Sequence, residues 1–87
     1  MKVECKNVPL RAVQVLASQL EAVGMVVTFD TLSLNAGSAH GIAGSLKFSH
    51  DGEHLTVTVT KDEGHFPRRM LLGGILQMVS EAVEATK

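Results

Sequence analysis

The chain lacks tryptophan and tyrosine, and it has one cysteine and three phenylalanines among its 87 residues. With so few aromatic rings, a surface on which nucleic-acid bases stack is disfavoured, and aliphatic side chains must fill the core. The lone Cys5 cannot form an internal disulfide, which favours a reducing compartment. The formal net charge of −1 gives no sign of a nucleic-acid partner.

Long apolar runs are also missing. None approaches the ~18 residues of a membrane-spanning helix, and the beginning of the chain does not read as a signal peptide. With 45% hydrophobic and 20% charged residues, we expect a folded cytoplasmic protein without a transmembrane segment. A chain of this length makes one domain, residues 1–87, and its core is marginal.

The clearest pattern is a hairpin between Gly41 and Thr60. Asp51-Gly52 is a signal for a two-residue turn. A turn there predicts four cross-strand pairs: His50 with Glu53, Phe48 with Leu55, Leu46 with Val57, and Gly44 with Val59. The apolar residues then share one face, and the other face carries Lys47, Ser49, His54, Thr56 and Thr58. A sheet with one apolar and one polar face is antiparallel and is covered on one side only.

The flanking segments complete the expected fold. Alternation predicts an edge strand over residues 2–6, and helical periodicity follows from Pro9 until Gly24 ends it. Residues 25–34 read as a strand, with either a bulge near residues 30–31 or leucines on its second face. Four further expectations are a loop at residues 35–38, a helix packed above Gly44, a polar connector at 61–64, and a last helix from Pro67 to about Ala85.

The element order is therefore β-α-β-β-β-α. It predicts a two-layer α+β domain in which an antiparallel sheet carries both helices on one face. That face is the one bearing Leu46, Phe48, Leu55 and Val57.

The last helix is apolar over two rows. One row is Leu71, Ile75, Met78 and Ala82, and the next is Leu72, Leu76, Val79 and Val83. The second row either packs against the first helix or forms a contact between subunits. Gly73-Gly74 costs ~1 kcal/mol per glycine, which favours close backbone approach over a kink or a frayed turn. The candidate interface of a two-fold homodimer is Leu72, Gly73, Leu76, Val79 and Val83.

Catalytic and metal-binding patterns are weak. His50 and His54 fall on opposite faces of the predicted hairpin, so they cannot bind one ion. His40 and His65 have no carboxylate or thiol at ligand spacing, and Cys5 has no assignable base. No glycine-rich segment has the context of a phosphate loop. We therefore predict no catalytic, cofactor-binding or metal-binding residue.

The cations at the start of the last helix need an explanation. Arg68 and Arg69 oppose the helix macrodipole, which favours anions there. Either Asp62 and Glu63 offset them, or a phosphate or carboxylate binds at His65, Arg68 and Arg69.

Two family resemblances accompany these patterns. The segment from Val3 to Val27, with Lys6-Asn7-Val8-Pro9-Leu10 within it, resembles the short N-terminal domain of secretins. The element order and Gly41-Ile42-Ala43-Gly44-Ser45-Leu46-Lys47 are similar to the polyhydroxyalkanoic acid system family of small proteins, although its usual tryptophan is absent. That second resemblance implies granule association or no assigned activity, and it carries no catalytic residues.

Three classes of function stay open. The first is a small non-enzymatic interaction or assembly module that self-associates or binds an unidentified protein. The second is a carrier of a small apolar acid or anion held by Arg68 and Arg69. The third is a small enzyme.

Overall fold

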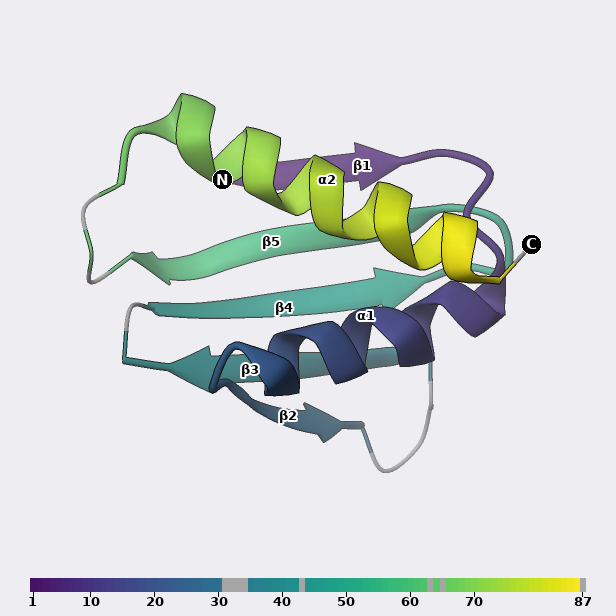
Figure 1. The fold of residues 1–87 in the computed structure, drawn as a ribbon, viewed down its shortest axis with the longest axis horizontal. Helices are drawn as coiled ribbons and strands as arrows, with labels where there is room; N and C mark the ends of the chain where they lie inside the picture. The colour runs from purple at the N-terminus through teal and green to yellow at the C-terminus, as the bar shows by residue number, and fades with distance from the viewer. Residues whose placement is uncertain (31–34, 43, 63, 65, 87) are drawn as a thin grey trace.

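The computed structural model describes residues 1–30, 35–42, 44–62, 64 and 66–86. Its elements are β1 Lys2–Cys5, α1 Leu10–Ala22, β2 Val26–Phe29, β3 Ala36–Gly41, β4 Gly44–His50, β5 Leu55–Asp62 and α2 Arg68–Ala85. The strands form one sheet in the order β1-β5-β4-β3-β2, and each neighbouring pair is antiparallel. Both helices lie across one face of this sheet (Figure 1), so the molecule is a two-layer α+β domain.

The helix boundaries follow from local chemistry as expected. Pro9 and Pro67 occupy the N-cap positions of α1 and α2, where a missing N–H costs nothing. At the other end of α1, Gly24 adopts φ +92°. The N–H of Gly24 donates to the Glu21 carbonyl, and the N–H of Met25 donates to the Leu20 carbonyl. This Schellman arrangement satisfies the last carbonyls of the helix, and it sends the chain back toward β2.

The core lies between the helices and the predicted apolar face. Phe48, Leu55 and Val57 are buried there, which confirms the face that the helices cover. From α1, five residues are buried: Ala12, Val13, Leu16, Ala17 and Leu20. From α2, only Val79 and Ala82 are buried. The second helix is therefore far less enclosed than the first.

The predicted register of the β4–β5 hairpin is wrong by two residues. His50 pairs with Leu55 and Phe48 pairs with Val57, so the loop contains residues 51–54 rather than two. The Asp51 carboxylate accepts the N–H groups of Glu53 and His54, and this closes the longer turn. Because side chains alternate with period two, a shift of two leaves Phe48 and Leu55 on the predicted face. His54, however, lies in the loop and not on the polar face.

The loop expected at residues 35–38 is instead part of a fifth strand, β3. This strand lies between β2 and β4 and pairs with both. Apart from His40, the residues of β3 are small, and Gly37 must be small because it lies beneath the Phe48 ring. The strand therefore forms through its two neighbours rather than through strong β propensity of its own.

The strand after the first helix and the glycine at the start of β4 are also the subject of expectations. Met25, Val27 and Phe29 alternate with exposed residues as predicted, but the possible bulge at residues 30–31 and the leucines beyond it involve residues outside the described part. The expectation that Gly44 allows a helix to pack closely above it is wrong, because the close neighbour of Gly44 lies within the sheet. A Cβ at Gly44 would collide with the Lys61 main-chain carbonyl of β5, and its φ of +153° also favours glycine.

Candidate functional site: the outer side of the second helix

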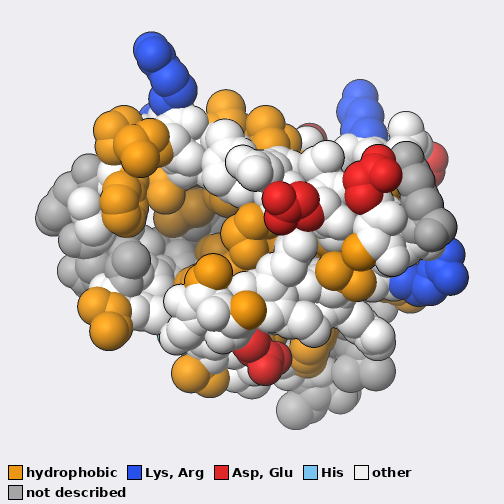
Figure 2. All heavy atoms as spheres, viewed as in Figure 1, with side chains coloured by type: hydrophobic (Ala, Val, Ile, Leu, Met, Phe, Trp, Pro, Cys, Tyr) orange, Lys and Arg blue, Asp and Glu red, His pale blue; other side chains and the backbone are white. Residues whose placement is uncertain are grey.

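The outer side of α2 exposes apolar side chains. Leu72 is 42% exposed, Leu76 44% and Met70 62%. Two members of the row that includes Leu72 and Leu76 are better covered, since Val79 is 5% exposed and belongs to the core, and Val83 is half-buried. Figure 2 shows hydrophobic side chains at the surface where α2 begins and along the rim beside this helix. The exposed part of the candidate interface is therefore its first half.

Gly73 and Gly74 lie in the same part of α2. A Cβ at either glycine would meet no described atom within 4 Å beyond the adjacent backbone of its own helix. The helix nevertheless continues through both from Arg68 to Ala85. No close packing of the described residues explains two glycines that weaken this helix by ~1 kcal/mol each. We call Met70, Leu72, Gly73 and Leu76 the outer patch.

A hollow separates α2 from the edge strand beneath it. Its volume is about 430 Å³. One wall is the stretch from Glu4 to Val8, and the other consists of Leu76, Val79, Ser80, Val83 and Glu84. We call it the edge groove. It joins the outer patch to the free side of β1, which is the edge of the sheet as predicted.

The predicted anion site is only partly described. Arg68 and Arg69 lie in the first turn of α2 with exposed side chains, and neither forms an ion pair with a described residue. His65 and Glu63 lie outside the described residues. The Oδ1 of Asp62 is buried and accepts no hydrogen bond from any described group, so this oxygen makes no contact with either arginine.

An apolar groove lies near the start of α2. Its volume is about 160 Å³, and its apolar lining is Met25, Leu46, Val59, Phe66, Leu71 and Ile75. Neither Arg68 nor Arg69 lines it.

Both ring nitrogens of His50 are hydrogen-bonded, whereas the buried Nδ1 of His54 has no hydrogen-bond partner among the described residues. His50 is 6% exposed, and its Nε2 lies 2.6 Å from the Val8 carbonyl oxygen. Its Nδ1 accepts the N–H of Gly52 at 3.0 Å, so Nε2 carries the proton and donates to Val8. His50 therefore joins the end of β4 to the segment before α1. The sequence carries no signal for this role beyond the position of His50 on the apolar face.

Cys5 is a buried free thiol in the core. Burial raises the pKa of the Cys5 thiol above its ordinary value. The thiolate is the reactive form, so this cysteine is a poor nucleophile near neutral pH. Its environment is that of a small core residue, despite Lys2 and Lys6 nearby in the sequence.

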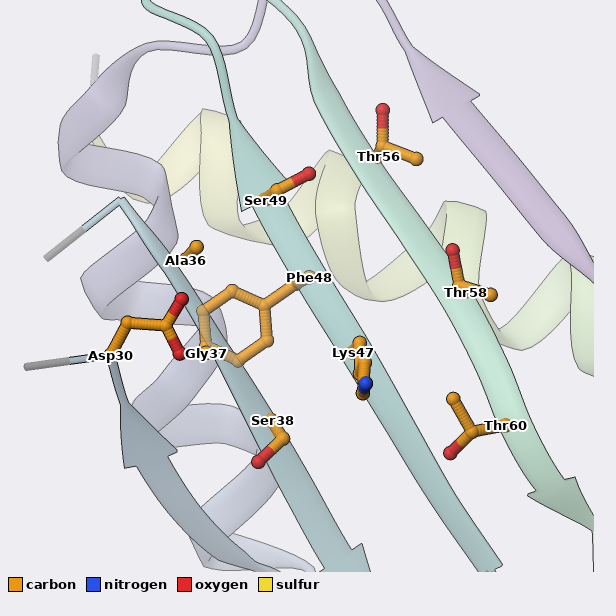
Figure 3. Close-up of a pocket in the computed structure, with 10 residues that line it drawn as sticks. All are labelled: Asp30, Ala36, Gly37, Ser38, Lys47, Phe48, Ser49, Thr56, Thr58 and Thr60. Atoms are coloured by element: carbon orange, nitrogen blue, oxygen red, sulfur yellow. The ribbon is translucent and has the colours of Figure 1, made fainter. Parts of the chain in front are cut away.

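The uncovered face of the sheet is polar and shallow. A hollow of about 570 Å³ lies there. In Figure 3, Ser38, Lys47, Ser49 and a row of three threonines project from neighbouring strands toward this hollow; the threonines are Thr56, Thr58 and Thr60. The sequence predicts Lys47, Ser49, Thr56 and Thr58 on this face, whereas it misses Ser38 because the pattern around β3 indicates a loop.

The same face contains a chain of hydroxyl and imidazole groups. His40 Nδ1 lies 3.0 Å from Ser45 Oγ, and His40 Nε2 lies 3.4 Å from Ser38 Oγ. The contacts are exposed, and no described carboxylate hydrogen-bonds to this imidazole. The group lacks the buried orienting acid that activates a serine through histidine.

The described residues contain no candidate metal site and no helix that could cross a membrane. No three His, Cys, Asp or Glu side chains in that part of the chain lie close enough together to hold a metal ion. Within the same residues, neither helix combines the length and apolar character that crossing a lipid bilayer requires. No protein-family model, curated protein or solved structure shows a significant match to this chain.

Proposed function

We propose that this protein is a non-enzymatic assembly module that forms a two-fold dimer through the outer side of α2. The observation that carries the proposal is the position of Gly73, which interrupts an exposed apolar surface and where an added Cβ would meet no described atom within 4 Å beyond its own stretch of helix. A second copy packed on this helix supplies the close backbone approach that favours glycine there. The lone buried Cys5 is consistent with a cytoplasmic location.

The energetics support association. Fully burying a leucine is worth about 1.5–3 kcal/mol, and Leu72 and Leu76 each keep over two fifths of their surface exposed. A two-fold contact completes this burial on both copies at once. A domain of this size has a small core, so added burial has a large relative effect on its stability.

A carrier of a small apolar acid has less support. A ligand site commonly measures about 300–1,000 Å³, whereas the apolar groove measures about 160 Å³. The two arginines that would hold the acid group do not line that groove. The assembly module is therefore the better-supported function.

The test is the mass of the protein in solution. Leu76→Glu places a charge in the proposed contact, and we expect the dimer to become a monomer with an unchanged circular dichroism spectrum. Leu10→Glu is the matched control, because Leu10 is 47% exposed and lies on the other helix. Light scattering and sedimentation equilibrium should show a dimer for the unaltered protein and for Leu10→Glu. A monomeric unaltered protein at the highest attainable concentration would overturn the proposal.

A further inference from the structure

Among the described residues, nothing pairs with the outer side of the edge strand β1. Met1 and Val59 exchange both main-chain hydrogen bonds, with N···O distances of 2.7 and 3.4 Å. Hydrogen-bonded pairs recur every second residue in an antiparallel ladder, so Val3 and Cys5 also direct their main-chain groups toward β5. The main-chain N–H and C=O groups of Lys2 and Glu4 therefore point away from the sheet. They form a template for one more strand.

The side chains of β1 divide between the two faces of the sheet. Val3 and Cys5 are buried on the helix side. Lys2 and Glu4 lie on the other face, with side chains 62% and 66% exposed, and their charged groups are 3.6 Å apart. Their partners on β5 are the neutral residues Thr58 and Thr56. The only charges on this strand thus alternate in sign along its free edge.

The charge pattern of β1 is complementary to that of β1 in a second copy. When β1 pairs with β1 of a second copy in antiparallel fashion, directly opposed residues share a face. A pair centred on Val3 places Lys2 opposite the partner's Glu4, and Glu4 opposite the partner's Lys2. A pair centred on Glu4 instead places Glu4 opposite itself and Lys2 opposite Lys6, and like charges directly opposite are destabilising.

A third register, centred on Cys5, also pairs unlike charges. It needs Lys6 and Asn7 to continue the strand. However, β1 ends at Cys5, and Asn7 has φ +58°, which turns the chain out of an extended conformation. The Val3-centred register uses only residues that are already extended.

We propose that two copies of this chain join their β1 strands in the Val3-centred register, so that the two five-stranded sheets become one continuous ten-stranded sheet. This inference rests on the assembly function proposed above and names the partner surface. The two-fold axis is perpendicular to the sheet, so all helices stay on one face. The outer sides of the two α2 helices then face each other across the axis, and the edge groove of each copy opens toward the other.

The pairing also gives hydrogen-bond partners to the outward-pointing main-chain groups of β1. Lys2 and Glu4 of the two copies form two hydrogen-bonded pairs, with four main-chain hydrogen bonds in total. The two-fold contact places two unlike-charge pairs on the open face. The exposed edge of the sheet disappears at the same time.

Charge reversal tests this register. Lys2→Glu or Glu4→Lys alone places two like-charge pairs in the dimer, and we expect the dissociation constant to rise about tenfold. The combined variant Lys2→Glu/Glu4→Lys restores both unlike pairs and should recover the original constant. An equimolar mixture of the two single variants should form a heterodimer at near-original affinity. One chain is then negative at both positions 2 and 4 and the other is positive at both, so every cross-strand pair joins unlike charges.

The mixture shows whether the charges act between chains or within one chain. Each single variant has lost its internal Lys2–Glu4 ion pair, and mixing the two variants cannot restore that pair. If Leu76→Glu dissociates the dimer while both charge variants keep the original constant, the α2 contact stands and the β1 pairing is overturned. Tighter association of Lys2→Glu would overturn the register, because the introduced carboxylate faces the partner's Lys6 only when Glu4 is central. A monomeric unaltered protein would overturn both proposals together.

Discussion

The Phe48 ring covers Gly37 from the neighbouring strand. The two residues are directly paired between β3 and β4. A Cβ at Gly37 would lie 2.9 Å from Phe48 Cζ and 2.5 Å from the Thr28 carbonyl oxygen. The Phe48 ring also meets the ring of Phe29 edge-on, with centroids 5.6 Å apart. The absence of a side chain at Gly37 therefore allows the aromatic residues of this core to pack over the sheet.

Gly37→Ala should destabilise the protein. The added methyl group must displace a buried ring and a main-chain carbonyl, and overpacking of this kind costs about 1–3 kcal/mol. The free energy of unfolding in urea measures the effect. Gly74→Ala is the control, because nothing lies within 4 Å of that position, and it should leave the free energy unchanged or raise it. Equal stability of Gly37→Ala and the unaltered protein would contradict the packing described for Phe48.

Gly73→Ala should act in opposite directions on the monomer and the dimer. In the monomer the helix gains about 1 kcal/mol, because alanine has the higher helix propensity and no described atom is crowded. In the proposed dimer the added methyl group would push the two helix backbones apart. We expect a higher melting temperature at low protein concentration together with a higher dissociation constant. A variant that dimerises as tightly as the unaltered protein would show that Gly73 is not at the contact.

His50→Phe should destabilise the protein through an unmade hydrogen bond. The ring keeps its approximate shape, but the Val8 carbonyl and the Gly52 N–H lose their partner. A buried group left without a partner costs about 1–3 kcal/mol. The matched control is His40→Phe, since His40 is exposed, and its effect should stay within about 0.5 kcal/mol. Thermal melts of both variants provide the comparison, and similar melting temperatures would contradict this role of His50.

The turn at Asp51 should make stability depend on acid pH. The N–H groups of His54 and Glu53 hydrogen-bond to the Asp51 carboxylate, and they lower its pKa below the ordinary value of 3.8. The unfolded chain therefore takes up this proton first as the pH falls. The stabilisation is complete above the unfolded pKa and disappears as the pH falls through the folded pKa.

Asp51→Asn isolates this effect, because its amide oxygen still accepts a hydrogen bond but carries no charge. We expect the variant to be less stable than the original protein near neutral pH, and the difference to shrink as the pH is lowered to about 2.5. Urea unfolding at a series of pH values measures it. A difference that stays constant across the series would show that the charge of Asp51 does not act in the turn.

The alternation of residue types was enough to predict the faces of the sheet. Phe48, Leu55 and Val57 could be placed under the helices because side chains on a strand change face at every residue. The starts of both helices could be predicted from Pro9 and Pro67, and the end of α1 from Gly24. These are local effects, in which one residue type favours or forbids one backbone conformation.

The hairpin register needed the folded molecule. Shifting β4 against β5 by two residues changes every partner and leaves every face the same, so hydrophobic patterning cannot distinguish the two registers. The choice depends on the carboxylate of Asp51 and the imidazole of His50, which together accept three of the four N–H groups of the loop. The fourth, that of Asp51, donates to the His54 carbonyl.

The sequence leaves two interpretations of the residues around the outer patch, namely packing against the first helix and contact with another subunit. The sequence places Leu72, Leu76, Val79 and Val83 in a single row, because helical periodicity reports only the side of a helix. The crossing of α2 over the sheet divides that row, with Val79 in the core and the two leucines in solvent. Burial depends on which residues a neighbouring element reaches, so only the tertiary structure separates core from surface within one apolar stripe.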